Sequence, residues 1–439
     1  MSVELPAPDI RVGRAHRRAA RADRERIAPH WIGVGCMRRG AVVLALLICT
    51  AAWAQPFLVE DFADPAAIEA RGITCSPDVS YEFADGAVTL TSPEGKGGSV
   101  SIPVDPALVA GNEAWDASNG ISFMVKGDGS ENWGRIGFGY RGYIYEHYFP
   151  LANTEWHEIR LHFDDLPGAG MIYPIGTPGN LPPSGIRTIQ LGDRWQLTWN
   201  NYPMPAHSFS VDEIRLIADA PEPAPAPAPR PLEEVIQKLR NHEPVSIQCM
   251  GDSITAGTGL PDRDTQQYAV LLGQKLRERL GYDQIESYSR AVGGARLTDA
   301  RIWAPRDFAD VRPDLVTIAY GYNDKTSAYP ADWYAYSLND YVDRIARETK
   351  GGAAICPITT LPGGGHRFIM LDDYAQAVRD LCAERGDVAC IDLAAQIKPM
   401  GRLQWMTYLG DLAHPNIAGH EWLAEALADW IVERVEAGG

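Results

Sequence analysis

A serine with candidate catalytic partners stands out in the second half of the chain. Ser253 lies in Gly251-Asp252-Ser253-Ile254-Thr255, directly after the apolar run 245–250. Downstream, Asp411-Leu412-Ala413-His414 places a carboxylate three residues before an imidazole. Such a carboxylate can hold the imidazole tautomer while the other ring nitrogen accepts the serine proton. Gly-Asp-Ser alone is also typical of a turn whose serine caps a helix. The downstream Asp411 and His414 favour the other interpretation, a nucleophilic serine that carries out acyl transfer through a serine ester.

Two further positions could stabilise negative charge on a substrate carbonyl oxygen. Gly294 follows the strand expected at 285–289, and the missing side chain lets a backbone N–H approach a developing oxyanion. Asn323 follows the run 315–320 and could add its side-chain amide as a second donor.

The elements that must position these residues alternate in type. Apolar strands at 245–250, 315–320, 353–358 and 388–391 are separated by helical stretches, one of which is predicted over 265–280 with its end at Gly281. Alternation of this kind predicts a parallel sheet covered by helices on both faces. Ligand sites in such sheets lie at the carboxyl ends of the strands, where Ser253 and its partners fall.

The order of these segments resembles the SGNH (GDSL-type) hydrolase superfamily, with Ser253, Gly294, Asn323 and His414 as the signature quartet. The resemblance covers roughly residues 244–437 and implies a flavodoxin-like αβα sandwich. It also implies an oxyanion hole of Ser253, Gly294 and Asn323, with Asp411 orienting His414.

One segment departs from the family pattern. Ser289-Arg290-Ala291 stands where the family usually places an asparagine near the start of its second block. We therefore expect the supporting hydrogen bonds there to differ, whereas the Gly294 donor is retained.

Other polar and aromatic residues near these motifs have structural interpretations. Asp252 is expected to be a buried carboxylate that accepts from turn amides rather than a catalytic acid, and Asp324 is ambiguous in the same way. His366 could touch substrate, but a solvated loop histidine is the simpler expectation. Three aromatic residues could line an acyl or sugar site or serve only in packing: Trp303, Tyr322 and Trp405.

A Pro/Ala segment divides the chain. Residues 220–231 read APEPAPAPAPRP, a composition that favours an extended, semi-rigid spacer between domains at 55–219 and 232–439. Upstream, short alternating segments between Gly, Pro, Asn and Asp predict an all-β sandwich. These segments are 87–91, 99–104, 121–125, 135–140, 156–163 and 211–217.

The upstream domain resembles jelly-roll carbohydrate-binding modules in Val59-Glu60-Asp61-Phe62, in Trp156-His157-Glu158-Ile159 and in residues 210–216. The resemblance makes Glu60 and Asp212 candidate ligands of a structural Ca²⁺, although carboxylates on a solvated rim explain them equally well. The domain is also rich in aromatic residues, which could stack on sugars but are mostly expected in packing. They are Trp133, Tyr140, Tyr143, Tyr145, Tyr148, Trp195, Trp199 and Tyr202.

The first 54 residues have the layout of a secretory signal. Met37-Arg38-Arg39 precedes the apolar run 40–52, which ends in Ala52-Trp53-Ala54. The run is too short to make a good membrane span, and cleavage before Gln55 is expected. We favour Met37 as the true start and predict a secreted or periplasmic protein without stable membrane insertion.

Charge and cysteine content restrict the partners. The formal net charge of −17 repels nucleic acid phosphates and anionic lipid, so neutral glycans or small esters are expected partners. No cysteine spacing resembles a zinc site, and no cofactor is expected for catalysis. Cys382 and Cys390 are the one pair that we expect to bridge in an oxidising compartment, the alternative being two buried thiols.

A β-sandwich followed by an SGNH domain resembles two-domain carbohydrate esterases, which implies removal of O-acetyl groups from a polysaccharide. A lipase, arylesterase or thioesterase is the nearest alternative. The polar neighbours of the serine, namely Thr255, Thr258, Asp262 and Arg263, argue mildly against long acyl chains. A non-catalytic glycan-binding protein is a second alternative, which the complete quartet with Asp411 disfavours.

Overall fold

A computed structural model describes residues 56–140, 143–170, 172–177, 180–193 and 205–437. The signal-like segment and its possible start at Met37 lie outside these residues, as do Trp195, Trp199 and Tyr202. Residues 54–439 form one compact unit. Within the described residues, no helix combines the length and the apolar character needed to cross a bilayer.

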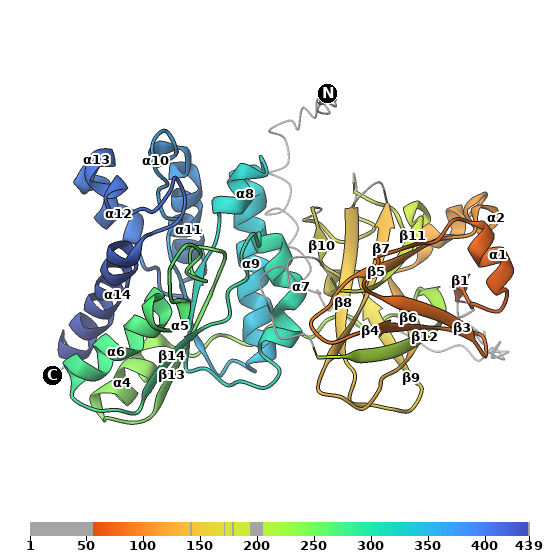
Figure 1. Cartoon of the computed structure of the whole chain (residues 1–439), viewed down its shortest axis with the longest axis horizontal. Helices are drawn as coiled ribbons and strands as arrows, with labels where there is room; N and C mark the ends of the chain where they lie inside the picture. Colours follow the sequence, from red (N-terminus) through yellow and green to blue (C-terminus); the bar gives the residue numbers. More distant parts are fainter. Residues whose placement is uncertain (1–55, 141–142, 171, 178–179, 194–204, 438–439) are drawn as a thin grey trace, which may run out of the picture. The chain divides into compact units, whose positions relative to one another are not determined.

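The first half of the described chain is built from two antiparallel sheets (Figure 1). One has the order β3-β4-β12-β6-β9, with β1 also paired to β12. Its strands are β1 (Phe57–Glu60), β3 (Ser80–Ala84), β4 (Ala87–Ser92), β6 (Gly120–Lys126), β9 (His157–His162) and β12 (His207–Ile217). The other has the order β10-β8-β7-β11-β5-β2. Its strands are β2 (Thr74–Cys75), β5 (Ser99–Pro103), β7 (Trp133–Tyr140), β8 (Tyr143–Pro150), β10 (Gly168–Ala169) and β11 (Thr188–Gly192).

Alternation along these strands explains why the two sheets share a core. Val88 and Leu90 of β4 and Ile136 and Phe138 of β7 are all fully buried in one hydrophobic cluster. Because successive side chains of a strand point to opposite faces, every second residue can face the opposite sheet. The predicted all-β sandwich is therefore confirmed. Short helical segments join its strands: α1 (Pro65–Ala70), α2 (Pro106–Val109), η1 (Glu113–Ala117), η2 (Phe163–Asp165) and η3 (Pro183–Gly185).

The second half contains a four-stranded parallel sheet with the order β14-β13-β15-β16. The strands are β13 (Val245–Gly251), β14 (Ile285–Ser289), β15 (Leu315–Ala319) and β16 (Ala354–Pro357). Since β13 lies between β14 and β15, this is the doubly wound strand order of flavodoxin-like folds. The segment predicted as a strand at 388–391 is not a regular strand, but it runs beside β16: Ile391 forms an isolated parallel bridge with Ile358, and the N–H groups of Ala389 and Ile391 donate to the carbonyls of Ile355 and Pro357 at 3.2 and 2.9 Å.

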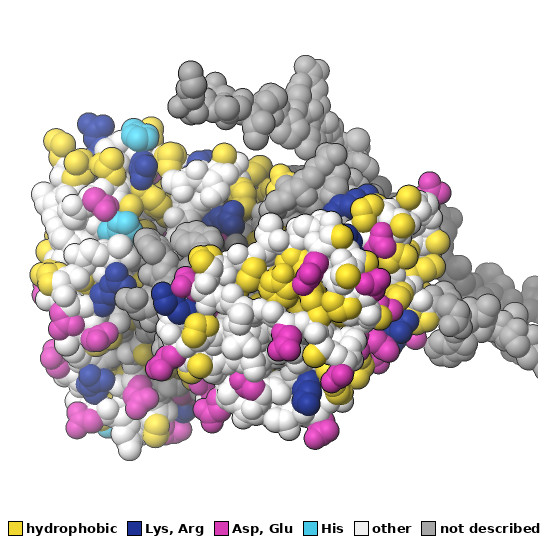
Figure 2. Space-filling view, turned by 45° about the vertical axis from the view of Figure 1, so that its right-hand side comes forward, with side chains coloured by type: hydrophobic (Ala, Val, Ile, Leu, Met, Phe, Trp, Pro, Cys, Tyr) yellow, Lys and Arg dark blue, Asp and Glu magenta, His cyan; other side chains and the backbone are white. Residues whose placement is uncertain are grey.

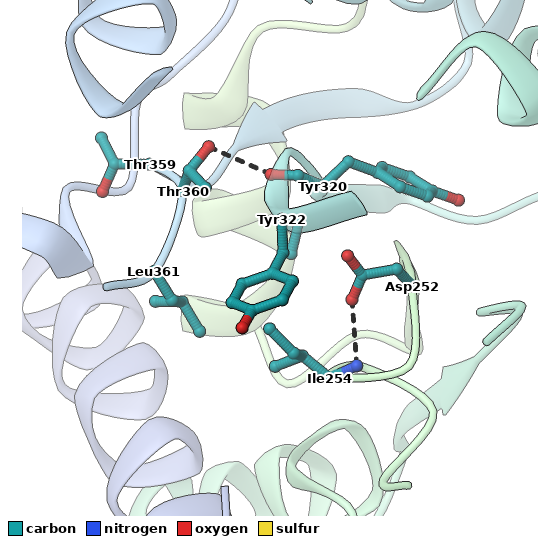
Figure 3. A pocket seen from close by; sticks show the side chains of 8 residues that line it. Asp252, Ile254, Tyr320, Tyr322, Thr359, Thr360 and Leu361 are labelled. Carbon is teal, nitrogen blue, oxygen red and sulfur yellow. Dashed lines mark hydrogen bonds between the residues drawn. The ribbon is translucent and has the colours of Figure 1, made fainter. Parts of the chain in front are cut away.

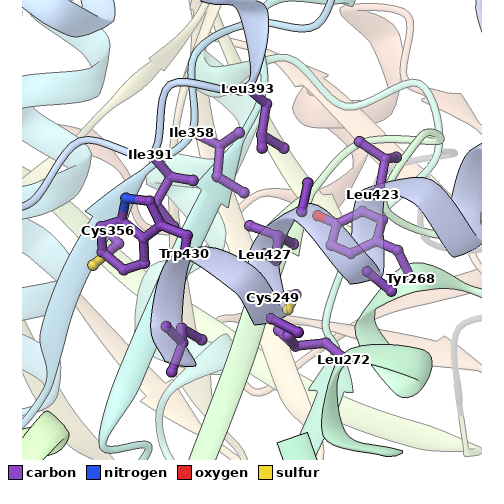
Figure 4. Packing of buried hydrophobic residues seen from close by; sticks show 14 of the residues in the cluster. Cys249, Tyr268, Leu272, Cys356, Ile358, Ile391, Leu393, Leu423, Leu427 and Trp430 are labelled. Atoms are coloured by element: carbon purple, nitrogen blue, oxygen red, sulfur yellow. The ribbon is translucent and has the colours of Figure 1, made fainter. Parts of the chain in front are cut away.

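Helices cover both faces of the parallel sheet (Figure 1). One layer consists of α4 (Leu232–Arg240), α6 (Tyr268–Leu280) and α14 (Ile417–Ala437), and the other of α7 (Leu297–Asp307), α9 (Ala331–Glu348) and α11 (Asp372–Arg385). Ile247 and Cys249 of β13 pack in the first cluster, whereas Met250 packs in the second. The αβα sandwich implied by the family resemblance is confirmed. Figure 4 shows α14 packing onto the sheet through Leu423, Leu427 and Trp430.

Shorter helices occupy the connections of this part of the chain. They are α5 (Arg263–Gln266), α8 (Tyr322–Thr326), α10 (Arg367–Met370), α12 (Leu393–Ile397), η4 (Lys398–Met400) and α13 (Gly401–Met406). The single helix predicted over 265–280 is in fact two, α5 and α6, with Gln267 in an extended conformation between them. His420 explains the break, because its Nδ1 accepts the backbone N–H of Tyr268 at 3.1 Å and so caps α6. Gly281 ends α6 in the left-handed region, as predicted.

The Pro/Ala segment is extended but is held at its C-terminal end. The backbone N–H of Arg230 donates to the carbonyl of Ala353 at 3.0 Å, and the guanidinium pairs with Asp314 at 2.7 Å. Ala226 packs against the cluster that contains α7, α9 and α11. A salt bridge and an apolar contact therefore attach this end of the extended segment to the α/β part of the chain.

Cys382 and Cys390 are free cysteines in the structure, so the expected bridge is not formed. Interaction with the Cys390 thiol and burial raise the pKa of Cys382, whereas interaction with Cys382 lowers the pKa of Cys390.

Candidate active site

The structure brings Ser253, His414 and Asp411 into one hydrogen-bonded row. His414 Nε2 lies 2.9 Å from Ser253 Oγ, and His414 Nδ1 lies 2.8 Å from Asp411 Oδ2. With the Nδ1 proton donated to the carboxylate, Nε2 is left as the acceptor for the serine hydroxyl. The three predicted catalytic residues therefore have the geometry of a nucleophile, a general base and an orienting carboxylate.

The nucleophile lies in a tight turn at the carboxyl end of β13. A Cβ at Gly251 would come within 1.9 Å of Thr255 Oγ1 and 2.9 Å of the Ala319 carbonyl, so this position needs glycine. The turn is closed by hydrogen bonds from Ala256 N–H to the Asp252 carbonyl and from Thr258 N–H to the Ser253 carbonyl, at 2.9 and 3.0 Å. Ser253 is half-buried and so remains accessible to substrate.

The Asp411–His414 loop is stabilised by its own carboxylate. Asp411 Oδ1 accepts the backbone N–H groups of Ala413 and His414 at 2.6 and 2.7 Å. Burial is the largest single influence and would raise the Asp411 pKa, but hydrogen bonds from the His414 ring and these amides lower it below its usual value. The carboxylate is thus ionised throughout the neutral range, as an orienting group requires.

Hydrogen bonds outside the triad hold the same loop in place. Gly364 N–H donates to the Leu412 carbonyl at 2.9 Å, and Tyr322 Oη donates to the same carbonyl at 3.2 Å. Arg367 in turn donates to Tyr322 Oη and lies over the tyrosine ring. Tyr322 directly precedes Asn323, so its side chain joins the predicted oxyanion hole to the histidine loop. The sequence allowed a lining or a packing role for Tyr322, and this connection was not predicted.

The two predicted oxyanion donors come from neighbouring loops. Gly294 has φ +75°, in the left-handed region that favours glycine. Asn323 Nδ2 lies 3.0 Å from the Ala295 carbonyl and 3.4 Å from Asp252 Oδ2. The longer of these two contacts is the weaker, so it is the one that a substrate oxyanion could replace.

The loop that carries Gly294 is held by buried carboxylates. Leu297 N–H donates to both oxygens of Asp324 at 3.1 and 3.2 Å, and Arg296 N–H donates to Asp299 at 3.0 Å. Asp324 and Asp299 are fully buried. The ambiguous Asp324 therefore has a structural contact that fixes the residues following Gly294.

The Ser289-Arg290-Ala291 departure has its own set of hydrogen bonds. Ser289 Oγ accepts the N–H of Ala291 at 3.2 Å, and Arg290 N–H donates to the Cys249 carbonyl at 3.1 Å. Val292 N–H donates to the Gly251 carbonyl at 3.1 Å. These bonds tie the second loop to the strand that carries the nucleophile, in the place where the family usually has asparagine.

Asp252 is a buried carboxyl group behind the nucleophile. Its Oδ1 accepts the N–H of Ile254 at 2.9 Å, as expected for an aspartate in a turn. Burial raises the pKa of Asp252 to about 7, although the turn amide and His414 oppose the shift. Burial likewise raises the pKa of Asp324 to about 7. Two carboxyl groups near the site therefore titrate close to neutrality.

The remaining aromatic and histidine candidates have mainly packing contacts. Trp303 and Trp405 are each 1% exposed, and Trp405 Nε1 donates to the Pro362 carbonyl at 2.8 Å. These two tryptophans belong to the core, which excludes direct sugar stacking by them. His366 directly precedes α10. It lies in the same loop as Gly364, which contacts the histidine loop through the Leu412 carbonyl.

The candidate calcium ligands of the sandwich have other partners. Glu60 pairs with Arg71 at 2.6 Å and accepts the N–H groups of Asp61 and Phe62. Asp212 accepts the N–H of Glu213 at 2.6 Å. Among the described residues, no three His, Cys, Asp or Glu side chains cluster as a metal site. The residues do not fit Ca²⁺ in this arrangement, because a cation at Glu60 would have to displace Arg71.

Comparison with known proteins supports the class of site that this geometry defines, a serine acylhydrolase. Residues 249–422 match the model of the GDSL-like Lipase/Acylhydrolase family. The α/β part of this chain is therefore a GDSL-like acylhydrolase domain. No match was found among the curated proteins.

Similar solved structures include carbohydrate esterases, all at low similarity. A two-domain esterase (CEX) active on acetylated mannans is 20% identical, with a TM-score of 0.36 over 47% of this chain and 53% of that one. The chain thus matches about half the length of that esterase. The acetyl xylan esterase AlAXEase is 20% identical, with a TM-score of 0.36 over 42% of this chain and 98% of that one. A family two carbohydrate esterase from Clostridium thermocellum is 17% identical, with a TM-score of 0.35 over 83% of this chain and 99% of that one. Similarity at this level does not identify a substrate.

Proposed function

We propose that this protein is a serine carboxylic ester hydrolase that removes O-acetyl groups from a polysaccharide. The observation that carries the hydrolase part is the row from Ser253 Oγ through the His414 ring to Asp411, with separations of 2.9 and 2.8 Å. The family match of residues 249–422 supports the same reaction class.

The proposed reaction has two halves. Ser253 Oγ attacks the ester carbonyl carbon as its proton moves to His414 Nε2, and His414 then protonates the departing alcohol. A water molecule next attacks the acyl-enzyme, giving its proton to His414, and the acid leaves as the proton returns to Ser253. Asp411 stays ionised and stabilises the imidazolium that forms in each half. These steps need no cofactor.

The negative charge of both tetrahedral intermediates requires donors. In the proposal, the N–H groups of Ser253 and Gly294 and the Asn323 amide supply them. Asn323 is suited to this role because its contact with Ala295 fixes the amide while its long contact with Asp252 is easily replaced. Such donors act without reorganising during the reaction.

The polysaccharide part of the proposal rests on the attached sandwich and on charge. The sandwich resembles carbohydrate-binding modules in sequence, and the chain has a net charge of −17, which disfavours polyanionic partners. Figure 2 shows Asp and Glu side chains dispersed among uncharged ones over one face of the molecule. A neutral acetylated glycan, met outside the cytoplasm as the signal-like residues 40–54 suggest, is compatible with this surface.

A lipase or arylesterase is the second candidate, and one observation favours it. Several large apolar side chains between residues 369 and 417 are more than 40% exposed, and this part of the chain contains the histidine loop. They are Ile369, Leu403, Met406, Leu412 and Ile417. An ester with an apolar alcohol would find contacts there.

Acetate release from acetylated xylan, mannan, pectin and peptidoglycan, beside hydrolysis of long-chain esters, tests the proposal. We expect wild type to release acetate from at least one glycan and Ser253→Ala to release none. Inactivity of wild type on every ester would refute the hydrolase proposal. Faster turnover of long-chain esters than of any acetylated glycan would select the second candidate. Binding of deacetylated glycan to full-length Ser253→Ala tests glycan recognition apart from catalysis.

A further inference from the structure

α7 (Leu297–Asp307), the helix that follows the proposed donor Gly294, is buried on every side. A helix in the outer layer of an αβα sandwich normally keeps a polar face in water, as α11 does with Asp373 and Gln376. Every residue of α7 except Pro305 is buried. The polar residues among them are Thr298, Asp299, Arg301, Arg306 and Asp307. A second surface, besides the parallel sheet, therefore covers the outer side of this helix.

That surface belongs to the β-sandwich. β8 and β10 contact α7, and Tyr148 and Ala169 of these strands lie in one hydrophobic cluster with Trp303 of the helix. The guanidinium of Arg306 lies over the Tyr148 ring, 5.7 Å from its centroid. Because Tyr148 is 1% exposed, the two parts of the chain share a continuous core at α7.

Arg301 attaches the middle of α7 to the sandwich by hydrogen bonds. Its guanidinium donates to the carbonyls of Ile172 and Gly168 at 3.2 and 3.4 Å. It also pairs with Asp340 of α9 at 3.2 Å. The Arg301 side chain is 2% exposed, and a buried charge is costly unless partners of this kind surround it. Two main-chain carbonyls of the sandwich therefore satisfy a charge that belongs to α7.

The neighbouring helix α9 makes the same kind of contact. Arg344 donates to the Asp164 carbonyl of the sandwich at 2.8 Å and pairs with Asp340 at 2.9 Å. Arg347 pairs with Asp165 at 3.1 Å. Arginines of two adjacent helices thus hold one connected segment of the sandwich, so the docked sandwich fixes the position of both helices.

The position of α7 bears directly on Gly294, because only Ala295 and Arg296 separate this residue from the helix. The first residue of the helix, Leu297, donates its N–H to Asp324 at 3.1 Å. A displacement of α7 would therefore move the Gly294 N–H as well. An oxyanion donor is effective only at about 2.7–3.1 Å from the developing charge, so a small displacement weakens it.

The surroundings of the other two proposed donors are anchored within the α/β part of the chain. The N–H of Ile254 donates to Asp252 at 2.9 Å, on either side of the nucleophile. Thr360 Oγ1 donates to the Tyr320 carbonyl at 3.1 Å, directly after β15. Figure 3 shows both bonds. Neither involves the sandwich, so Gly294 is the donor whose placement depends most on docking.

We propose that docking of the β-sandwich on α7 through Arg301 positions the backbone N–H of Gly294 for stabilisation of the transition state. Arg301 is then a positioning residue, and the sandwich contributes to catalysis independently of any glycan that it binds. This proposal rests on the proposed ester hydrolase function and assigns the sandwich a part in it.

Steady-state hydrolysis of p-nitrophenyl acetate by full-length variants tests the proposal, with circular dichroism as the check on folding. This ester carries no glycan, so a change in rate reports on the hydrolase site. Arg301→Met removes the bonds to the sandwich and should lower kcat and kcat/KM together by about 10- to 100-fold, because misplacing a group by about 1 Å costs up to about 100-fold. Arg301→Lys keeps the charge without the planar fork and should lose less.

Arg385→Met is the matched control. Arg385 joins α11 to α9 through Asp343 at 2.8 Å, and its partners lie within the α/β part of the chain. Its replacement should leave kcat unchanged. Hydrogen exchange measured by mass spectrometry gives a second readout that needs no activity. The segment 292–303, with Gly294 and the first turns of α7, should exchange faster in Arg301→Met than in wild type.

The outcomes separate the positioning role from the proposed function. If wild type hydrolyses no ester, the hydrolase proposal fails, whereas hydrogen exchange still shows whether Arg301 holds α7. If wild type is active, the positioning role alone is refuted by a kcat of Arg301→Met equal to that of Arg385→Met, by unchanged exchange at 292–303, or by a rise in KM without a fall in kcat. If Arg301→Met does not fold, the same measurements on Arg301→Lys decide.

Discussion

Tyr322 donates from its hydroxyl to the carbonyl of Leu412 at 3.2 Å and so connects the residue before Asn323 to the loop between Asp411 and His414. Replacement by phenylalanine keeps the ring and removes this bond, together with the one that Arg367 donates to the same hydroxyl. Loss of a hydrogen bond of this kind costs about 0.5–1.5 kcal/mol. We therefore expect Tyr322→Phe to lower kcat by about 2- to 10-fold with little change in KM.

The matched control for Tyr322→Phe is Tyr282→Phe. Tyr282 Oη donates to the Glu243 carbonyl at 3.2 Å, the same chemistry near the opposite ends of β13 and β14. Its loss should leave kcat unchanged. Equal kcat for Tyr322→Phe and wild type in steady-state assays would show that the bond does not position the histidine loop.

Asp411→Asn should lower kcat far more than it lowers stability. The neutral amide cannot stabilise the imidazolium, and it favours the wrong tautomer of His414. In a serine protease the equivalent change costs about 10⁴-fold, and we expect a loss on the order of 10²–10⁴ here. Because hydrogen bonds lower the Asp411 pKa, wild type should keep this carboxylate ionised as pH falls toward 4. Initial-rate measurements on Asp411→Asn give the change in kcat, and melting temperatures check that the variant is folded. A fall in kcat of less than about threefold would contradict the role assigned to Asp411.

Asn323→Ala should act on the transition state rather than on binding. Removal of one oxyanion donor costs about 10²–10³ in kcat. KM should change little, because the charge that the amide stabilises develops only after Ser253 attacks. The amide also contacts the Ala295 carbonyl, so circular dichroism must show that the fold is kept. A raised KM with normal kcat would assign Asn323 to ground-state binding instead.

Asp324 should make the folded state less stable as pH rises. Burial raises its pKa from the usual 3.8 to about 7, so between these values the folded chain binds more protons than the unfolded chain. The free energy of unfolding then falls with increasing pH across this window. Asp324→Asn retains an oxygen to accept the Leu297 N–H and removes the titration.

The expected result is a difference in melting temperature between Asp324→Asn and wild type that grows in favour of the variant from pH 5 to pH 8, by about a few degrees. Glu278→Gln, at an exposed position on α6, should show no such trend. A constant difference between Asp324→Asn and wild type over this range would mean that Asp324 does not titrate there.

Strong local patterns made much of the fold predictable from the sequence. Alternating side chains predicted six of the sandwich strands to within a few residues, but not β1, β2, β3, β8, β10 or β11. The aromatic residues of β8 were mostly expected in packing, and Tyr145 and Tyr148 are indeed buried. The split between α5 and α6 was not predictable, because it depends on His420, which lies more than 150 residues away in the sequence.

The candidate site, like the fold, was predictable from the sequence only in part. Ser253, Gly294 and Asn323 follow β13, β14 and β15, and Asp411 and His414 stand three residues apart before α14, so their order was sufficient to propose them from the sequence. The supporting contacts of Tyr322, Arg367 and Asp324 join segments that are distant in sequence. They depend on side-chain directions that no spacing encodes.

Labelling with a fluorophosphonate tests the central claim, that Ser253 is a nucleophile activated by His414. The reagent forms a stable adduct with an activated serine, and intact mass followed by peptide mapping locates it. We predict one adduct per chain on Ser253, none on Ser253→Ala, and strongly slowed labelling of His414→Ala. Labelling of wild type at another residue, or equal labelling of Ser253→Ala, would contradict the account.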